Sequence, residues 1–297
     1  MNRVIKVSDE TIAKMIKYYN DKKRQKTPPH AIFQAMEEDT VVTLYKSGKA
    51  MFQGISADID ANMWQEMDNH LGSESLKKEI DYYHVSSIGS DEVGTGDYFG
   101  PIVVTATYVN EKDIKFLEEL GIKDSKKVDD DLILKIVPKL IKRIKYSSII
   151  LNNIEYNQKY SNEFNMNKIK AILHNKVLSN MLTNKLEYDY IIVDKFVNEN
   201  SYYNYLKEHN KPVKKITFLT KAEDKNLSVA CASIISRYIF IKEFDKLSSE
   251  LKIKLPKGAG KTVDKIGRQI LKKYGIEKLK EISKYNFKNT ERVLKTD

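Results

Sequence analysis

The sequence predicts an α/β protein with two units, a small N-terminal unit of helices and antiparallel strands and a larger unit with a mixed sheet. In the first unit a helix is followed by short antiparallel strands and a second helix. In the second unit successive strands come first, and the later strands alternate with helices. A polar, charged stretch at 72–83 separates the two patterns. We therefore expect one domain over residues 1–71, a linker over 72–83 and a second domain over 84–297.

The N-terminal unit is expected to begin and end with a helix. Ser8 is a suitable N-cap for a helix over 8–24, and the two prolines of Thr27-Pro28-Pro29 end it. A second helix is expected over 56–71, with Trp64 in its core-facing stripe. Ser47-Gly48 predicts a hairpin turn. The strands predicted between the helices are 31–36, 40–45 and 50–52.

The second unit begins with successive strands and continues with long helices. A mixed sheet follows from this order, because consecutive strands pair antiparallel whereas strands joined through helices favour parallel pairing. Pro138 requires a kink or break in the first predicted helix. The predicted strands are 85–90, 101–109, 146–151, 190–193 and 215–219, and the predicted helices are 129–144, 165–184 and 226–247.

Composition excludes several classes of protein. The 297 residues are 41% hydrophobic and 31% charged, which suits a packed core. No apolar run is long enough to span a bilayer, and the first residues lack the apolar stretch of a secretory signal. Cys231 is the only cysteine, so an internal disulfide and a cysteine-based zinc site are excluded. We expect a cytoplasmic monomer with no membrane association and no obligate protein partner.

The net charge of +10 is concentrated at the two ends of the chain. Residues 1–30 carry eight basic and three acidic residues, and residues 251–297 carry fourteen and five. The segment 31–81 is acidic, and 82–250 is nearly balanced. Clustered lysines release counterions from phosphates, so a polyanionic partner is one interpretation of these ends; a solvated lysine-rich surface is the other.

Two carboxylates, Asp91 and Glu92, end an apolar strand and are followed at once by Gly94-Thr95-Gly96. Neighbouring residues of a regular strand point to opposite faces, so these two carboxylates share one site only where the strand frays or bends. The glycines permit such a bend and also allow a ligand to approach the backbone closely. This segment is the first candidate for a functional site.

Further carboxylates follow two later strands. Asp194 ends the strand 190–193, and the pair Glu223-Asp224 follows the strand 215–219, which leaves open which member of the pair joins the site. Sites in open α/β sheets collect where neighbouring strands end. Converging carboxylates repel unless cations neutralise them, and all-oxygen ligands favour Mg²⁺ or Mn²⁺. Such a site with a basic periphery suits two-metal cleavage of phosphodiesters.

At these residues the chain resembles the type 2 ribonucleases H, and among them the bacterial ribonuclease HIII family. Ribonuclease HII is similar but typically has arginine where this chain has Thr95, and it usually lacks an extension like residues 1–71. That extension resembles the TATA-binding-protein-like substrate-binding domain of ribonuclease HIII. The resemblance covers nearly the whole chain, and the segments that carry it most specifically are 90–101, 121–127, 167–175, 193–196, 221–223, 228–237 and 256–260.

The resemblance implies a ribonuclease H-like fold and hydrolysis of the RNA strand of RNA–DNA hybrids, which leaves 5′-phosphate and 3′-hydroxyl ends. It implies that the metal-binding, catalytic carboxylates are Asp91, Glu92, Asp194 and Glu223. Other residues suit substrate contacts, because glycine backbone lies easily against ribose and cationic or amide groups against phosphates. These candidates are Gly94, Thr95, Gly96, Lys123, Ser125, Lys126, Asn167 and Lys170.

Two other functions stay open at this point. One is a related metal-dependent nuclease that acts on DNA, and the other is a nucleic-acid-binding module without chemistry. A pure binding module has no need to concentrate anions beside phosphates, which argues against the second. The ordered motifs of the resemblance argue against the first.

Overall fold

The structure is a computed structural model that describes residues 2–37, 39–74, 80–122, 129–208 and 211–295. Two units divide the chain between Ile80 and Asp81, and each has its own sheet and its own buried core. Each unit is therefore described by itself. No described helix combines the length and apolar composition that a bilayer crossing requires.

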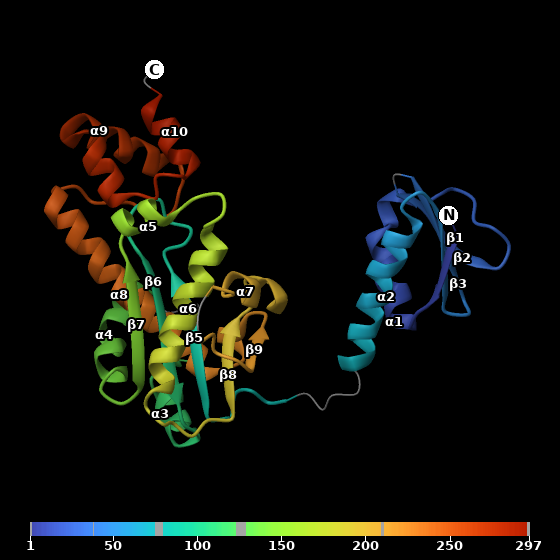
Figure 1. Ribbon diagram of the computed structural model, residues 1–297, viewed down its shortest axis with the longest axis horizontal. Coiled ribbons are helices and arrows are strands. Elements are labelled where there is room, and N and C mark those ends of the chain that lie inside the picture. Colours follow the sequence, from blue (N-terminus) through green and yellow to red (C-terminus); the bar gives the residue numbers. More distant parts are fainter. Residues whose placement is uncertain (1, 38, 75–79, 123–128, 209–210, 296–297) are drawn as a thin grey trace. The chain divides into compact units, whose positions relative to one another are not determined.

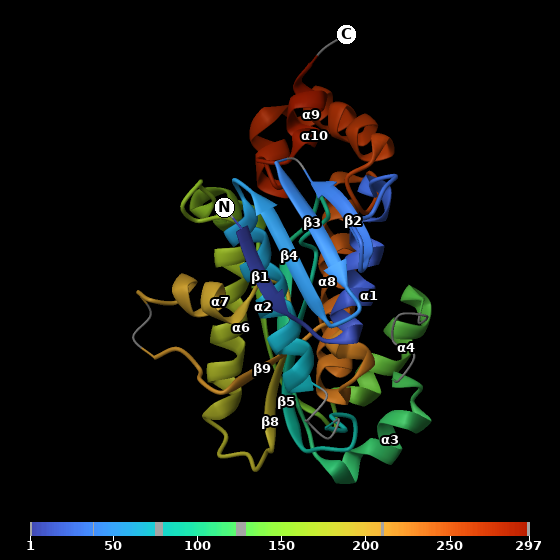
Figure 2. The ribbon, with the colours of Figure 1, turned by 90° about the vertical axis from the view of Figure 1, so that its right-hand side faces the viewer.

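The N-terminal unit contains a four-stranded antiparallel sheet with the order β1-β4-β3-β2 (Figure 2). Its first strand is absent from our sequence prediction. Only Ile5 of that strand is buried, so the local alternation is weak, and pairing with the edge of β4 makes it a strand. The four strands are β1 (Asn2–Lys6), β2 (Ala31–Glu37), β3 (Thr40–Tyr45) and β4 (Lys49–Gly54).

Two helices, α1 (Asp9–Tyr18) and α2 (Ala57–Glu74), cover one face of this sheet. Ser8 caps α1 as predicted, because its hydroxyl accepts a hydrogen bond from the amide of Thr11. The predicted core position of Trp64 is confirmed, and its indole N–H donates to the hydroxyl of Tyr19 at 2.8 Å. The first helix ends earlier than expected, in a 3₁₀ turn, and the second ends later.

The second unit has a five-stranded mixed sheet with the order β7-β6-β5-β8-β9 (Figure 1). Strands β7, β6 and β5 pair antiparallel, and β5, β8 and β9 pair parallel. The predicted mixed sheet is therefore confirmed. The strands are β5 (Ser87–Val93), β6 (Ile102–Val109), β7 (Lys145–Leu151), β8 (Tyr190–Asp194) and β9 (Ile216–Leu219).

Two long helices, α6 (Met166–Leu182) and α8 (Leu227–Leu251), pack on opposite faces of β5 and β6 (Figure 1). Ile88 packs in the core that contains α6, whereas Gly89 faces α8. The predicted helix over 129–144 ends at Leu140, two residues after Pro138. The remaining helices are α3 (Ile114–Glu119), α4 (Asp130–Leu140), α5 (Asn153–Lys159), α7 (Glu199–Tyr205), α9 (Lys261–Ile282) and α10 (Lys288–Leu294).

The close approach of β5 to α8 requires a glycine at position 89. A Cβ atom there would lie 2.4 Å from the hydroxyl of Ser228 and 2.5 Å from the amide nitrogen of Val229. We expect Gly89→Ala to lower the free energy of unfolding by about 1–3 kcal/mol, measured by urea denaturation, because the helix has to move away from the strand. Gly96→Ala is the control, since a Cβ at position 96 meets nothing within 4 Å. Equal stability of the two variants would contradict this account.

Candidate active site

The site lies where the parallel pairing of β5 and β8 stops. β5 pairs with β8 only as far as Ser90 and Val193, but it continues to pair with β6 as far as Val93. The sequence argument required a frayed or bent strand for the two carboxylates to meet, but β5 stays regular through both of them. The edge of β5 that faces β8 is open from Asp91 onward, and Asp91 and Glu92 leave this edge toward opposite faces of the sheet.

Asp91 lies on the α8 face. Its carboxylate is hydrogen-bonded to the side chain of Ser233 and accepts the amide of Glu92 at 2.8 Å. Ser236 donates to the backbone carbonyl of Asp91 at 3.2 Å. Burial, and then the nearby charge of Glu92, raises the pKa of Asp91 to about 7, although the two hydrogen bonds to its carboxylate act in the opposite direction.

Glu92 lies on the α6 face, and both of its oxygens are engaged. The ammonium of Lys170 contacts Oε1, and Nε2 of His174 donates to Oε2 at 2.8 Å. The other ring nitrogen of His174 is hydrogen-bonded to the hydroxyl of Ser90 at 2.8 Å. Burial by itself acts to raise the pKa of Glu92, but His174 and Lys170 outweigh it and lower the pKa to about 2.

Asp194 ends β8 as predicted, and the amide of Ala222 donates to its Oδ1 at 2.8 Å. Burial raises the pKa of Asp194, and the charges of Glu223 and Glu92 act in the same direction. Glu223 is half-buried in the short helical turn η4 (Ala222–Asp224), whereas Asp224 is exposed. Of the two alternatives that the sequence left open, Glu223 is thus the one whose charge bears on Asp194.

The glycine loop after β5 combines a buried turn with an open backbone. Gly94 has φ +94°, and a Cβ there would lie 2.2 Å from the carbonyl oxygen of Pro101. Its conformation is required by the turn. Thr95 is half-buried, and Gly96 is exposed with open space around it. The accessible part of the predicted ribose contact is therefore Thr95 and Gly96.

Residues near the C-terminus form hydrogen bonds with the backbone and the carboxylate of this loop. Lys284 is fully buried, and its ammonium donates to the carbonyls of Asp97 at 2.8 Å and Gly100 at 2.7 Å. The amide of Gly258 donates to the carboxylate of Asp97 at 2.5 Å. Sequence reasoning missed Lys284, because nothing distinguishes one buried lysine among the many basic residues of 251–297.

Of the residues predicted to contact phosphates, the structure describes only the two on α6, and these two differ in exposure. Asn167 is exposed in the first turn of α6. Lys170, expected on the same phosphate-facing surface, instead turns inward to Glu92, and 11% of its side chain is exposed. Lys123, Ser125 and Lys126 lie outside the residues that the structure describes.

Two site residues found in the structure, His174 and Ser233, were not among the predicted site residues. His174 is spaced four residues after Lys170, which places both on one face of α6. That spacing is the signal that would have found it. Ser233 lies on α8 and is brought to Asp91 only by the packing of that helix on β5.

The donor chemistry of the site fits a hard divalent cation. Its four acidic side chains offer only oxygen, and burial, together with the charges of neighbouring carboxylates, raises the pKa values of Asp91 and Asp194. Within the described ranges, no three His, Cys, Asp or Glu side chains already stand close enough together to hold a metal ion. The carboxylates stand apart because Asp91 and Glu92 leave β5 on opposite faces, and because Lys170 and His174 of α6 bind the carboxylate of Glu92.

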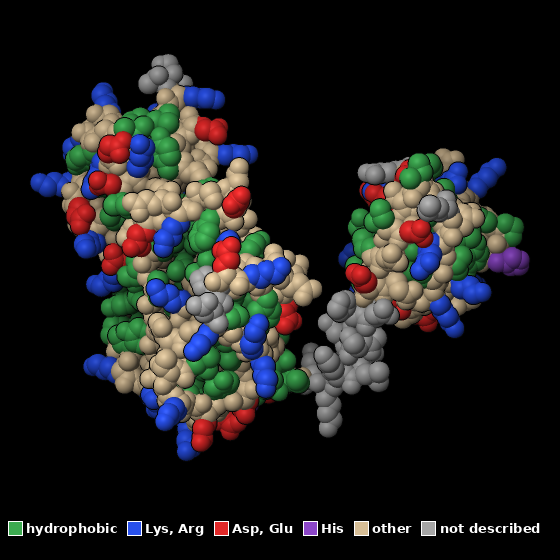
Figure 3. All heavy atoms as spheres, viewed as in Figure 1, with side chains coloured by type: hydrophobic (Ala, Val, Ile, Leu, Met, Phe, Trp, Pro, Cys, Tyr) green, Lys and Arg blue, Asp and Glu red, His purple; other side chains and the backbone are tan. Residues whose placement is uncertain are grey.

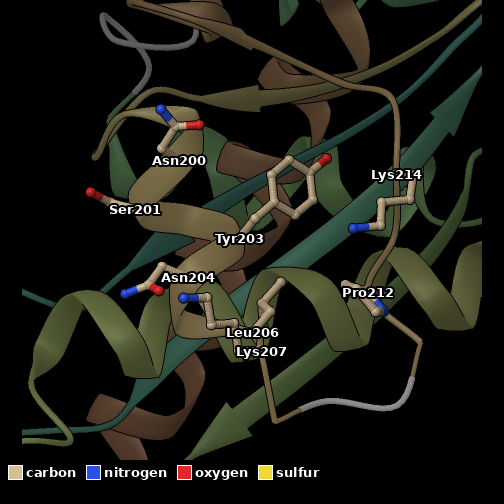
Figure 4. A pocket seen from close by; sticks show the side chains of 8 residues that line it. All are labelled: Asn200, Ser201, Tyr203, Asn204, Leu206, Lys207, Pro212 and Lys214. Carbon is tan, nitrogen blue, oxygen red and sulfur yellow. The ribbon is translucent and has the colours of Figure 1, made fainter.

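A separate cavity of about 790 Å³ lies beside α7 (Figure 4). It contains none of the four carboxylates, so it is not the site described above. The cavity is lined by Asn200, Ser201, Tyr203, Asn204, Leu206, Lys207, Pro212 and Lys214.

The described residues on the visible face of the second unit form no surface of one charge sign. Its lysine and arginine side chains are interspersed with acidic ones and reach the C-terminal helices (Figure 3).

Comparisons of the sequence find two families. The profile of the family described as Ribonuclease HII matches residues 88–290, and that of a domain of unknown function (DUF3378) matches residues 2–77. Ribonuclease HIII of Bacillus cereus is 40% identical over 304 residues, covering 98% of this chain and 97% of that protein. Ribonuclease HIII of Bacillus thuringiensis subsp. konkukian shows the same identity and coverage.

Solved structures agree with these matches. The crystal structure of Bst-RNase HIII in complex with Mn²⁺ superposes with a TM-score of 0.70 at 35% identity, covering 99% of this chain and 98% of that one. Ribonuclease H2 from Pyrococcus horikoshii OT3 shares the fold, with a TM-score of 0.59 at 23% identity over 70% of this chain and 96% of that one.

The buried position of Lys284 predicts a distinct pH dependence of stability. Burial lowers the pKa of Lys284 from 10.5 to about 7, although Asp97 opposes the shift. Between these pH values the unfolded chain binds a proton that the folded chain lacks, so this group makes the free energy of unfolding rise with pH. We expect Lys284→Met to flatten that rise between pH 7.5 and about 9.5 in chemical denaturation, and the exposed Lys288→Met to leave it unchanged. Parallel curves for wild type and Lys284→Met would contradict the burial argument.

Proposed function

Because the chain belongs to the ribonuclease HIII family, an endonuclease family that cleaves RNA in RNA–DNA hybrids, we propose that it hydrolyses the RNA strand at Asp91, Glu92, Asp194 and Glu223 by two-metal-ion catalysis. The observation that carries the proposal is that Asp91, Glu92 and Asp194 lie where β5 and β8 stop pairing, and that Glu223, in the turn after β9, acts electrostatically on Asp194. A DNA nuclease and a binding module without chemistry lack this combination of family and site.

We propose Mg²⁺ or Mn²⁺ as the ions that the four carboxylates hold; the crystal structure of Bst-RNase HIII contains Mn²⁺. The chemistry such ions supply is activation of a water for in-line attack and neutralisation of the leaving 3′-oxygen, which gives 5′-phosphate and 3′-hydroxyl ends. The protein's own contribution is orientation. His174 and the amide of Ala222 fix one oxygen each of Glu92 and Asp194.

The loop of Thr95 and Gly96 is the proposed contact to the ribose strand. An exposed glycine lets 2′-hydroxyls approach the backbone, and these groups distinguish RNA from DNA. Lys284 supports this loop through the carbonyls of Asp97 and Gly100. Asn167 and the segment that includes Lys123, Ser125 and Lys126 are the proposed phosphate contacts.

The N-terminal unit is the proposed hybrid-binding domain. Its helices cover one face of the sheet, and the other face exposes apolar side chains such as Ile32 and Met36. Basic residues lie along β2: Lys23 is 5.9 Å from the ring centroid of Phe33, and Arg24 donates to Gln34. Apolar contacts beside cations suit the shallow minor groove of a hybrid.

We place this activity in the cytoplasm, in DNA replication and repair, and expect the chain to act as a monomer. Cys231, a free thiol buried in α8, suits a reducing compartment. A preference between primers and longer hybrids would be set by the substrate contacts described above.

The carboxylates are tested by Asp91→Asn and Asp194→Asn, each of which removes one charge from the site with little loss of packing. We expect turnover of labelled RNA–DNA hybrid in Mg²⁺ or Mn²⁺ to fall at least about a hundredfold, while hybrid binding survives. Asp224→Asn, at the exposed neighbour of Glu223, is the control and should retain turnover.

Parallel DNA–DNA and RNA–RNA duplexes distinguish the alternatives. Cleavage of the DNA duplex by the wild type would favour the DNA nuclease, and tight binding without cleavage of any duplex would favour the binding module. Near-wild-type turnover of either aspartate variant would remove that residue from the proposed metal ligands.

The role of the N-terminal unit is tested by deleting residues 1–80, the boundary at which the units divide. We expect the hybrid dissociation constant to rise at least about tenfold at moderate salt and its salt dependence to flatten, because fewer phosphates are neutralised. Turnover at saturating hybrid should survive, since the four carboxylates remain. A folded truncation with unchanged affinity and salt slope, in fluorescence anisotropy titrations, would exclude the N-terminal unit as the binding domain.

A further inference from the structure

We propose that Lys170 competes with a divalent cation for the carboxylate of Glu92 and thereby sets the cation concentration at which the site fills. The inference rests on the proposed function, because it takes Glu92 as a cation ligand. It assigns Lys170 as a positioning residue that acts through Glu92 rather than on the substrate.

The contacts of Glu92 carry the first step. Lys170 contacts Oε1, and His174 donates to Oε2 at 2.8 Å, so one helix engages both oxygens of the carboxylate. The pair is shielded from water, with 11% of the Lys170 side chain and 12% of the Glu92 side chain exposed. In such surroundings an ion pair is screened far less than at the surface.

A second contact keeps the ammonium of Lys170 in this place. Its Nζ lies 4.1 Å from the ring centroid of Phe196, within the range of a cation–π interaction. The ring of Phe196 is stacked on His174 at 5.4 Å. Phe196 follows β8, so the strand that supplies Asp194 also supplies the surface on which Lys170 rests.

The ammonium of Lys170 and a divalent cation cannot both contact Oε1 of Glu92. A divalent ion bound there would lie about 2.1 Å from the oxygen, and an ammonium in contact with the same oxygen would stand within a few ångströms of it. Like charges at such separations repel strongly away from bulk water. Lys170 therefore has to leave Oε1 before Glu92 ligates a cation there. His174, on the other oxygen, is free to remain and to orient the carboxylate.

Lys168 offers a matched control on the same helix. Its ammonium lies 3.7 Å from Oε2 of Glu208, a carboxylate that is 84% exposed, and 5.1 Å from the ring centroid of Phe164. It thus has the same charge and a similar aromatic neighbour, but its partner is at the surface. Removing it changes the net charge as much as removing Lys170 does.

The experiment is calorimetric titration of Mn²⁺, and separately of Mg²⁺, into the full-length chain without nucleic acid. We expect Lys170→Met to lower the dissociation constant about tenfold and Lys168→Met to change it less than about twofold. Lys170→Arg, which keeps the charge, should remain near the wild type. In chelator, Lys170→Met should melt at a lower temperature than wild type, and saturating Mn²⁺ should close the gap, because the cation then replaces the lost charge.

Two outcomes would overturn the proposal. An unchanged or weaker cation affinity in Lys170→Met would show that Lys170 does not compete, and equal tightening in Lys168→Met would show an effect of net charge alone. Should Lys170→Met fold poorly, Lys170→Gln gives the same readout. Hybrid cleavage by the wild type is assayed separately. If the wild type cleaves hybrid but Lys170→Met does not bind the cation more tightly, only this inference is contradicted. If Lys170→Met binds the cation more tightly but the wild type cleaves no hybrid, only the proposed function is contradicted.

Discussion

The parallel pairing of β5 with β8 stops at Ser90 and Val193, and the arrangement of the site depends on that step. Beyond it β5 keeps its partner β6 on one side and has an open edge on the other. The carboxylates of Asp91 and Glu92 leave this edge close to Asp194, which ends β8. A longer β5–β8 ladder would fill the edge with backbone hydrogen bonds and close the space beside the acidic side chains.

The regular alternation of β5 gives its two neighbouring carboxylates opposite environments. Asp91 faces α8, where burial raises its pKa to about 7, and Glu92 faces α6, where His174 and Lys170 lower its pKa to about 2. Two acidic residues of nearly equal chemistry thus differ because different helices pack on the two faces of one strand. Two neighbouring buried carboxylates are tolerated because Lys170 and His174 of α6 compensate the charge of one of them, Glu92.

The basic C-terminal segment has a structural role as well as a charge. Lys284 is buried beneath the glycine loop, and Asp264 joins α9 to α10 through hydrogen bonds with Asn289 and Arg292. The charge of this segment is therefore not simply a surface for polyanions. Part of it holds the backbone that follows β5, so the end of the chain supports a candidate site formed by its middle.

The sequence by itself determined the mixed sheet, the core position of Trp64, the place of Asp194 at the end of β8 and the family, because strand periodicity and ordered motifs are local properties. It missed β1, the short helices and α9 and α10, whose local patterns are weak and whose form comes from packing. Only the tertiary structure decided that β5 stays regular at Asp91, that Glu223 rather than Asp224 acts on Asp194, and that Lys170 turns inward. These outcomes depend on which helix packs on which face of the sheet, and a contact between residues distant in the chain leaves no periodic trace in either segment.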